Sequence, residues 1–412
     1  MSEWRKVSLS DVVSLQRGHD LPESQRQSGS IPVVGSFGGI TGYHNEAKAQ
    51  GPGVTIGRSG ASFGIVGYIE SDYWPLNTAL YVTDFKGNDP YYVFNLLRQI
   101  DFSGFNSGSA QPSLNRNYIA NIEVDIPSFE IQRQIAAVLS AFDDKIELNR
   151  QMNRTLEQMA RALFKSWFVD FDPVRAKMRG EVPEGMDAET AALFPDELVE
   201  MEEREVPEGW KWVTVGDIAT QAKDQITPLS QPEASFAHFS IPAFDAKHQP
   251  TIEKGSEIKS GKFLVPDRAI LVSKLNPSTP RIWNVVRDNV ADFNVCSTEF
   301  IPLVASQTVF DSLLHAALND ENFSKALTGQ ASGTSNSHQR VRPADILNAP
   351  LLMPSKNVVV EFDSLTASII EQVKQNLHES AELVQIRDAL LPRLLSGEVD
   401  VGDWEGAISN SG

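Results

Sequence analysis

Residues 131–163 read IQRQIAAVLSAFDDKIELNRQMNRTLEQMARAL, and this stretch decides how the chain is organised. Apolar positions recur in alternating steps of four and three, which is typical of a helix that packs lengthwise on another helix. The ends of the series are apolar and its middle is polar. The series is Ile131, Ile135, Val138, Phe142, Lys145, Asn149, Met152, Leu156, Met159 and Leu163.

The same pattern returns 227 residues later, in the stretch VVVEFDSLTASIIEQVKQNLHESAELVQIRDAL of residues 358–390. We therefore predict an internal repeat whose two halves meet through these long helices. If the helices run antiparallel, their polar middles meet. A buried asparagine often fixes the register of such a pair, although polar positions can also simply face solvent. The expected register residues are Lys145, Asn149, Gln372 and Asn376. The second series is Val358, Phe362, Leu365, Ile369, Gln372, Asn376, Glu379, Leu383, Ile386 and Leu390.

A β-rich segment precedes each helix, and the two segments open on similar phrases. Trp4–Val12 reads WRKVSLSDV, and Trp210–Ile218 reads WKWVTVGDI. Each segment ends in a Gly/Ser-rich loop, a short strand-like run and a Pro-Ser step, which marks the start of a helix. We predict an α+β chain with the order globule, helix, globule, helix.

Composition restricts the class of protein. The chain has 412 residues, is 41% apolar and contains one cysteine, Cys296, which we expect to be a small buried residue in a reducing compartment. We see neither a long apolar run nor the shape of a signal peptide, so we expect a cytoplasmic protein without a membrane span.

A net charge of −18 would argue against nucleic-acid binding if it were spread evenly over the chain, but it is not. Residues 181–208 carry eleven acidic residues with Arg204 as their one base, and residues 356–412 carry ten acidic residues with four bases. The two globules and the first helix are close to neutral. Local basic patches are therefore compatible with the sequence.

Motifs that resemble catalytic sites lack the structural context that their chemistry needs. Residues 60–64 (GASFG) match the G-x-S-x-G pattern of a nucleophile elbow, which needs a helix directly after the serine. A strand-like run, Ile65–Ile69, follows instead and favours a glycine-rich hairpin. The scattered histidines lack metal-ligand spacing. We therefore expect an absence of catalytic and metal sites in this chain.

Four passages resemble the specificity subunit of type I restriction–modification enzymes. They are GSAQ at 108–111 leading to Ile126-Pro127, IQRQI at 131–135, ALFKSWFVDF at 162–171 and LLPRLLSGEV at 390–399. In this order, within a duplicated plan, they cover essentially the whole chain. The second repeat departs from the family phrase, since Val358–Glu361 lacks the step around Gln132 and Ser337-His338-Gln339 replaces Gln-Pro-Ser.

The resemblance implies two β-rich target recognition domains separated by two long antiparallel coiled-coil helices. With the repeat, it gives a division into target recognition domain 1 (1–127), a first spacer helix (128–172), an acidic linker (173–208), target recognition domain 2 (209–354), a second spacer helix (355–396) and a tail (397–412). The acidic composition of residues 181–208 favours a solvated linker with a short helix near 187–193.

The resemblance also implies a subunit without catalysis or cofactors of its own. Each domain would read one half of a bipartite, asymmetric sequence in double-stranded DNA. Two methyltransferase subunits using S-adenosylmethionine would dock on the helices, and two restriction subunits using ATP and Mg²⁺ would complete the complex.

Polar loops next to isolated cations are the expected DNA contacts, because amide and guanidinium groups bind phosphates and base edges. A solvated loop is the alternative for each residue. In the first domain we select Arg58, Ser59, Ser109, Gln111, Asn115 and Arg116, and in the second Lys274, Asn276, Arg281, His338, Gln339 and Arg340.

The aromatic run around Phe164, Trp167 and Phe168 has apolar residues on more than one helical face. We interpret it as a surface for a methyltransferase subunit, with packing against the chain's own second half as the alternative. Two other functions stay open for the whole chain. It could be a stand-alone enzyme with an unrecognised site, or a coiled-coil scaffold whose globules bind protein.

Overall fold

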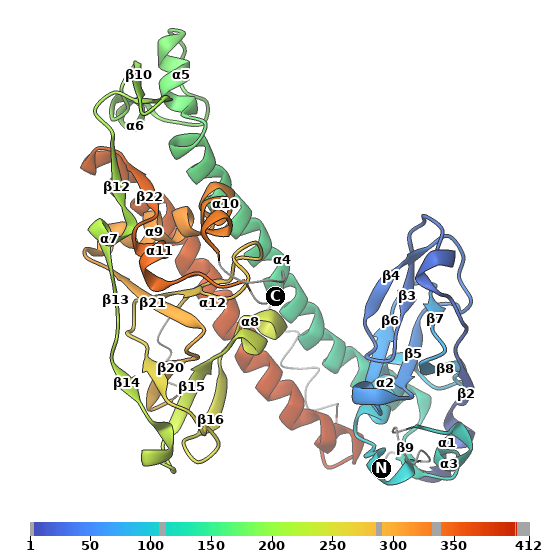
Figure 1. Cartoon of the computed structure of the whole chain (residues 1–412). Coiled ribbons are helices and arrows are strands. Elements are labelled where there is room, and N and C mark those ends of the chain that lie inside the picture. The colour runs from blue at the N-terminus through green and yellow to red at the C-terminus, as the bar shows by residue number, and fades with distance from the viewer. Residues whose placement is uncertain (1–3, 107–112, 286–290, 332–338, 400, 402–412) are drawn as a thin grey trace. The chain divides into compact units, whose positions relative to one another are not determined.

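The computed structural model describes residues 4–106, 113–285, 291–331, 339–399 and 401. The chain divides into two compact units, Met1–Asn149 with His378–Gly412, and Arg150–Leu377. Each unit combines one β-rich domain with one part of each long helix (Figure 1). The expected α+β class with two long antiparallel helices is confirmed.

The first domain is built on a four-stranded antiparallel sheet and a smaller three-stranded sheet. The central strand of the larger sheet is buried at every residue, as expected for a strand covered on both faces. The larger sheet has the order β2 (Ser14–Arg17), β8 (Ala79–Asp84), β5 (Gly53–Gly57), β6 (Val66–Ile69), and the smaller one β4 (Ile40–His44), β3 (Ile31–Val34), β7 (Trp74–Pro75).

The two ends of the first domain meet where the long helix begins. Strand β1 (Arg5–Ser8) pairs antiparallel with β9 (Glu123–Ile126), which leads into that helix. Ser8 and Asp11 form a capping box that starts the next turn of helix. The short helices of this domain are α1 (Leu9–Val12), η1 (Glu23–Gln25), η2 (Gly60–Ser62), α2 (Pro90–Arg98), η3 (Ser103–Phe105) and α3 (Arg116–Ile119).

The second domain repeats this plan, with a five-stranded sheet in place of the three-stranded one. Its strand pair β12 (Lys211–Thr214) and β22 (Pro350–Met353) corresponds to β1 and β9. One sheet has the order β13 (Ala219–Gln221), β21 (Phe300–Ala305), β18 (Ile270–Ser273), β19 (Ile282–Asn284). The other has the order β14 (Gln225–Ile226), β17 (Lys262–Leu264), β20 (Phe293–Cys296), β15 (Ser235–Phe239), β16 (Thr251–Lys254).

Short helices surround these sheets. Thr214 and Asp217 form a capping box at the position that Ser8 and Asp11 occupy in the first domain, so the repeat extends to its caps. The helices are α7 (Val215–Ile218), η4 (Pro228–Ser230), α8 (Ile241–Lys247), η5 (Thr308–Phe310), α9 (Asp311–Leu318), α10 (Glu321–Gln330) and α11 (Pro343–Leu347).

The two long helices, α4 (Phe129–Phe168) and α12 (Lys356–Leu395), each contain 40 residues. In the first unit, Lys145 Nζ lies 3.3 Å from Glu379 Oε2, while Asp143 pairs with Arg387. In the second unit the Trp167 and Phe362 rings are 5.9 Å apart, and Asn153 bonds to Asn376. In both units, residues further along α4 contact residues earlier in α12, so the two helices are antiparallel within each unit.

The inner face of each long helix differs from the expected series at alternate positions in its middle part. On α4, Ile146 and Asn153 are buried, whereas Met152 and Met159 are exposed. On α12, Thr366 and Ser380 are buried, whereas Leu365 and Ile386 are exposed. The prediction is therefore wrong at these positions. Each of these buried residues is the next one along the chain from an expected position, and this one-residue shift is the same in both repeats. The reason is that Asn153, Thr366 and Ser380 find hydrogen-bond partners inside, which outweighs their polarity.

Residues 173–208 form a folded segment, unlike the solvated linker that composition predicts. The segment contains part of α5 (Asp172–Met178), then α6 (Ala188–Ala192) and the hairpin of β10 (Leu198–Met201) with β11 (Arg204–Pro207). Val174, Phe194 and Val206 enter the core of the second unit. The short helix expected near Asp187 is present, with the Asp187 carboxylate accepting the Thr190 N–H at 2.7 Å.

Membrane insertion receives no support from the helices of the described residues. Even α4 and α12, the longest of them, fall short of the apolar character that a bilayer-spanning segment requires.

Candidate nucleic-acid interface

A cleft of about 630 Å³ opens on the first domain, beside the ends of its central strands. The end of β2 and the loop after it form one wall, and residues 113–116 form another. Arg58, directly after β5, lies between them. The lining residues are Gln16, Arg17, Gly18, His19, Asp20, Arg58, Leu80, Ser113, Leu114, Asn115 and Arg116.

Backbone hydrogen bonds fix the position of Arg58 in this cleft. Its N–H donates to Thr78 O at 2.9 Å, and its carbonyl accepts the Leu114 N–H at 2.8 Å. Ser59 forms a β-bridge with Ser113, so the wall of residues 113–116 is joined to the chain next to the arginine. The Asn115 side chain caps α3 by accepting the Asn117 N–H at 3.0 Å. The backbone of the cleft is therefore fixed before any ligand binds.

Three guanidinium groups line the cleft together with one carboxylate, that of Asp20. Arg17 and Arg58 each donate to Asn77 O at 3.4 Å, and Arg116 donates to Leu15 O at 3.2 Å. These contacts to backbone carbonyls hold the side chains, and none of the three pairs with a carboxylate of the described residues. Positive charge in a concave site with fixed walls attracts phosphate, and a guanidinium fork also matches the O6/N7 edge of guanine.

Three of the residues that we selected from the sequence line this cleft, namely Arg58, Asn115 and Arg116, and Ser59 adjoins it. Ser109 and Gln111 lie outside the described residues. The structure adds Arg17 and His19, which sequence reasoning missed. The polar stretch Gln16-Arg17-Gly18-His19 at a strand end was the available signal.

The second domain repeats the backbone arrangement at Lys274. Its N–H donates to Glu299 O at 2.8 Å, and its carbonyl accepts the Val341 N–H at 3.0 Å. Leu275 bridges to Arg340, as Ser59 bridges to Ser113. Lys274 therefore corresponds to Arg58 by hydrogen bonding as well as by chain order. Asn276 joins the group, because its N–H donates to Gln339 O at 2.9 Å.

Two cations of the second domain are already paired with carboxylates. Arg340 Nη2 lies 3.0 Å from Glu299 Oε1. The Arg281 side chain is 15% exposed and donates two hydrogen bonds to Asp245, at 2.7 and 2.9 Å. These hydrogen bonds raise the pKa of Arg281. Arg281 therefore has a structural contact in this state, and its role in DNA binding stays a prediction. His338 lies outside the described residues.

The register residues of the long helices divide into two kinds. Asn149 and Asn376 are buried, and both bond across to the facing helix within their own units. Lys145 lies at the edge of the pair beside Glu379. Gln372 is exposed and supports Asn376, whose Oδ1 accepts its amide N–H at 2.9 Å.

The interpretation of Phe164, Trp167 and Phe168 as a partner surface is wrong for this structure. All three side chains are buried in the core of the second unit. Phe362 lies 6.2, 5.9 and 4.9 Å from the three rings by centroid, and Trp210 and Phe194 complete the cluster. The alternative, packing against the chain's own second half, describes them correctly.

Metal binding and nucleophilic catalysis receive no support from the described residues. No group of three or more His, Cys, Asp or Glu there is arranged to hold a metal ion. Burial raises the pKa of Cys296 to about 12, so its thiol is unreactive. Ser62 ends the 3₁₀ turn η2, and a strand follows it, so the geometry of a nucleophile elbow is missing.

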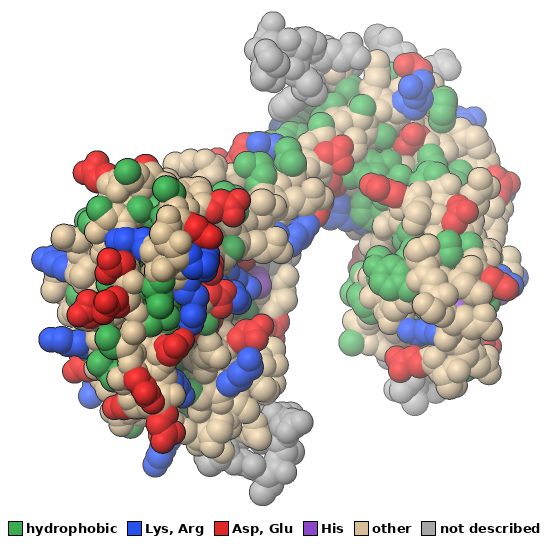
Figure 2. All heavy atoms as spheres, turned by 90° about the horizontal axis from the view of Figure 1, so that it is seen from above, with side chains coloured by type: hydrophobic (Ala, Val, Ile, Leu, Met, Phe, Trp, Pro, Cys, Tyr) green, Lys and Arg blue, Asp and Glu red, His purple; other side chains and the backbone are tan. Residues whose placement is uncertain are grey.

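Basic and acidic side chains are interspersed on the face of the molecule drawn in Figure 2.

Known proteins share both the sequence and the fold. Residues 1–158 match the family model described as the type I restriction modification DNA specificity domain. Over 347 residues the chain is 30% identical to the HindI specificity subunit of Haemophilus influenzae, and the match covers 70% of this chain and 71% of that protein.

The chain belongs to the family of type I restriction enzyme specificity subunits.

A second relative is the MjaIX specificity subunit of Methanocaldococcus jannaschii, with 28% identity over 76% of this chain and 68% of that one. Among solved structures, the type I restriction–modification S subunit from M. genitalium has the same fold, with a TM-score of 0.57 and 15% identity over 95% of this chain and 96% of that one. As a specificity subunit, the chain supplies the DNA sequence specificity of a restriction–modification system. The sequence resemblance is thereby confirmed.

Proposed function

We propose that each domain of this specificity subunit reads one half of a bipartite, asymmetric sequence in double-stranded DNA. The observation that carries the proposal is the repeated site. Arg58 and Lys274 occupy corresponding positions, each fixed by a hydrogen bond from the chain segment that also carries Arg116 or Arg340. Two related sites on one chain suit two half-sites of unrelated sequence, because the residues around the shared cations differ.

In the first domain, Arg17, Arg58 and Arg116 are the proposed contacts. Phosphate contacts fix the position of a protein on DNA, and contacts to base edges provide specificity. The cleft offers both, because guanidinium groups stand beside the amide of Asn115. In the second domain the proposed contacts are Lys274, Asn276, Gln339 and Arg340. Binding there would exchange the Arg340–Glu299 pair for a DNA contact.

The long helices are the proposed spacer between the two half-sites. A 40-residue helix is about 60 Å long. One turn of B-DNA is about 34–36 Å. Helices of this length suit an unread stretch of DNA between the bases that the domains contact.

Methyltransferase subunits are the proposed partners of the helices, and the exposed apolar positions suggest where they dock. Met159 on α4 is 54% exposed and Ile386 on α12 is 45% exposed. These two residues are separated by 227 positions, the offset of the internal repeat. One docking surface per repeat suits two methyltransferase subunits, which would bring S-adenosylmethionine. Two restriction subunits, with ATP and Mg²⁺, would join them in the cytoplasm, and this chain would direct the reaction without catalysing it.

The test is to co-express the chain with its methyltransferase subunit and to map methylated adenines by single-molecule sequencing. We expect one bipartite motif. Arg58→Ala with Arg116→Ala should weaken recognition at one half-site, and Lys274→Ala at the other, each by about tenfold or more. Arg5→Ala, which removes an exposed charge from β1 of the same domain, is the matched control.

Equal losses at both half-sites, or none, would contradict the assignment of these residues. Two other functions give different results. A stand-alone enzyme would methylate or cleave DNA without partners, and a protein-binding scaffold would fail to crosslink to DNA with or without the methyltransferase subunit.

A further inference from the structure

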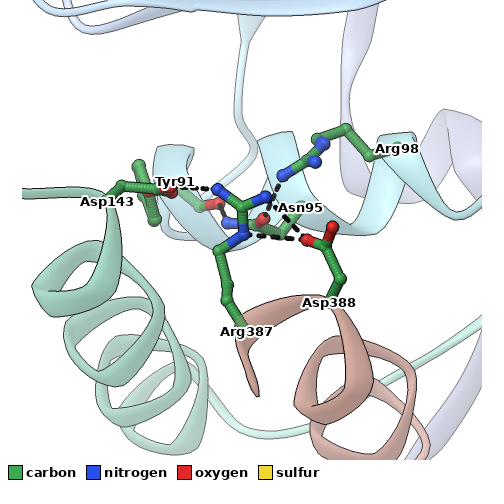
Figure 3. A network of polar contacts seen from close by, with 6 residues as sticks. All are labelled: Tyr91, Asn95, Arg98, Asp143, Arg387 and Asp388. Atoms are coloured by element: carbon green, nitrogen blue, oxygen red, sulfur yellow. Dashed lines mark hydrogen bonds and ion pairs between the residues drawn. The ribbon is translucent and has the colours of Figure 1, made fainter. Parts of the chain in front are cut away.

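A polar cluster joins the first domain to both long helices (Figure 3). The Tyr91 hydroxyl on α2 donates to Asp143 on α4, and Asp143 also accepts from Arg387 on α12. Arg387 donates to its neighbour Asp388 as well, at 2.9 and 2.6 Å. We call Tyr91, Asp143 and Arg387 the junction clamp. Three elements distant in sequence thus meet at one carboxylate, all within the first unit.

The junction clamp is partly shielded from water, since the Asp143 side chain is 30% exposed. The Arg387 side chain is 13% exposed. Burial lowers the pKa of Arg387, but its hydrogen bonds to Asp388 and Asp143 outweigh this effect and raise it overall. Burial raises the pKa of Tyr91 far above its ordinary value, and the hydrogen bond to Asp143 raises it further. A partly desolvated ion pair of this kind fixes geometry more than it adds stability.

Helix α2 is held at a second point by Gln132 of α4. The Gln132 side chain is buried, accepts the Asp89 N–H at 3.0 Å, and donates to Asn88 Oδ1 at 2.9 Å and to Pro127 O at 3.1 Å. Two anchors on one short helix leave it little freedom to rotate or slide on the long helices.

Helix α2 in turn contacts the strands that carry the recognition cleft. Tyr91 packs edge to face on Tyr68 of β6 at 5.0 Å, and α2 lies against both β6 and β5. Strand β5 ends at Gly57, and Arg58 follows directly. A chain of packed groups therefore runs from Arg387 through Tyr91 and Tyr68 to the strand that presents Arg58.

The second repeat has a different set of residues at these positions. The 227-residue offset places Ile370 opposite Asp143 and Ala160 opposite Arg387. The junction clamp is therefore a feature of the first domain alone, and the family plan of two recognition domains on two helices does not account for it.

We propose that the junction clamp sets the angle of the first recognition domain on the long helices, and thereby the length of spacer that the protein accepts between its half-sites. The inference rests on the proposed function. Tyr91, Asp143 and Arg387 are positioning residues, since they act through α2 and β5 and lie outside the cleft. Without the clamp, the domain contacts the same bases from a wider range of angles.

The test uses the chain reconstituted with its methyltransferase subunits. DNA duplexes carry the mapped half-sites with the natural spacer, or with a spacer one base pair shorter or longer. We expect Arg387→Met to reduce the preference for the natural spacer by about tenfold and Tyr91→Phe by less, with unchanged base preference in each half-site. Arg387→Lys should recover part of the preference, because lysine keeps the charge but lacks the planar fork.

Arg393→Met is the matched control, because Arg393 lies on the same helix and forms an exposed ion pair with Glu398 at 2.9 Å. It should behave as the wild type. If Arg387→Met destabilises the chain, Tyr91→Phe alone decides, since it removes only a hydroxyl. Wild-type spacer preference in a folded clamp variant overturns the inference, as does a change in half-site bases. A wild-type chain without any bipartite motif instead refutes the proposed function.

Discussion

The two domains join the long helices through different chemistry, although they occupy corresponding places in the repeat. The first junction combines an apolar core, which includes Ile135 and Leu391 of the long helices, with polar contacts of Gln132 and the Tyr91–Asp143–Arg387 clamp. The second is aromatic, with Trp167 and Phe362 at its centre. At the repeat position of Gln132 the second helix carries Val359, which is fully buried in an apolar core.

The comparison shows that the fold determines where each domain contacts the helices, whereas the individual residues determine the kind of interaction made there. Apolar contacts are non-directional and large, so the aromatic junction contributes stability. Hydrogen bonds and ion pairs are directional and have a small net free energy, so the polar contacts that the first junction adds to its apolar core contribute orientation.

The aromatic junction should break with the largest loss of stability. Trp167→Ala removes a buried ring from the cluster with Phe194 and Phe362, and should lower the free energy of unfolding by about 3–5 kcal/mol. Denaturant unfolding followed by circular dichroism measures this loss. Val360→Ala, at an exposed position on α12, should change it by about 0.5 kcal/mol or less. A loss near that of the control would show that the cluster is not a core.

The polar junction should break at Gln132 with a smaller loss. Gln132→Leu leaves the Asp89 N–H and the Asn88 side chain without their partner, and should lower the free energy of unfolding by about 1–3 kcal/mol. Thermal unfolding of Gln132→Leu and of Val359→Leu measures the two losses of stability. Val359→Leu is the comparison, because the second junction is already apolar at that position. An equal effect of the two leucines would remove the contrast between the junctions.

Acid should weaken the second unit through His315 of α9. Burial, together with the positive charge of Arg161 on α4, lowers the pKa of His315 to about 4. Because the folded state binds the proton more weakly than the unfolded state, this stability is complete above pH ~6.5 and is lost as the pH falls toward 4. By pH 5 the loss should be about 1–2 kcal/mol. Unfolding of the wild type and of His315→Gln across this range gives the measurement, and parallel pH profiles would refute it.

The middle of the helix pair should show the smallest effect and the strongest coupling. Asn376→Leu leaves the Asn153 amide without its 2.8 Å partner and should cost about 1 kcal/mol. Asn153→Leu with Asn376→Leu removes both polar groups, and should be close to neutral or stabilising while it loosens the register. A double-mutant cycle checks this, and additive losses would contradict the pairing.

The seam shows how far periodicity alone reaches. A heptad pattern predicts two long helices and their repeat, but it cannot decide between neighbouring positions such as Met152 and Asn153. Hydrophobicity favours Met152, whereas the structure buries Asn153, because Asn376 on the facing helix satisfies its amide. The same limit applies to Phe164, Trp167 and Phe168, whose partners Phe362, Phe194 and Trp210 come from distant segments.

The candidate site was predictable in part for the same reason. Polar residues next to strand ends pointed to Arg58, Asn115 and Arg116, but only the folded chain brings Arg17 beside them. Conversely, Arg281 has the right residue type, and its pairing with Asp245 is invisible in the sequence.

The sequence by itself determined the α+β class, the internal repeat, the two long helices and the family, because these are properties of spacing and order along the chain. Only the tertiary structure decided which residues face inward, which cations keep their charge available, and that Tyr91, Asp143 and Arg387 meet. Those outcomes depend on contacts between residues far apart in the sequence, whose free energy exists only when both partners are in place.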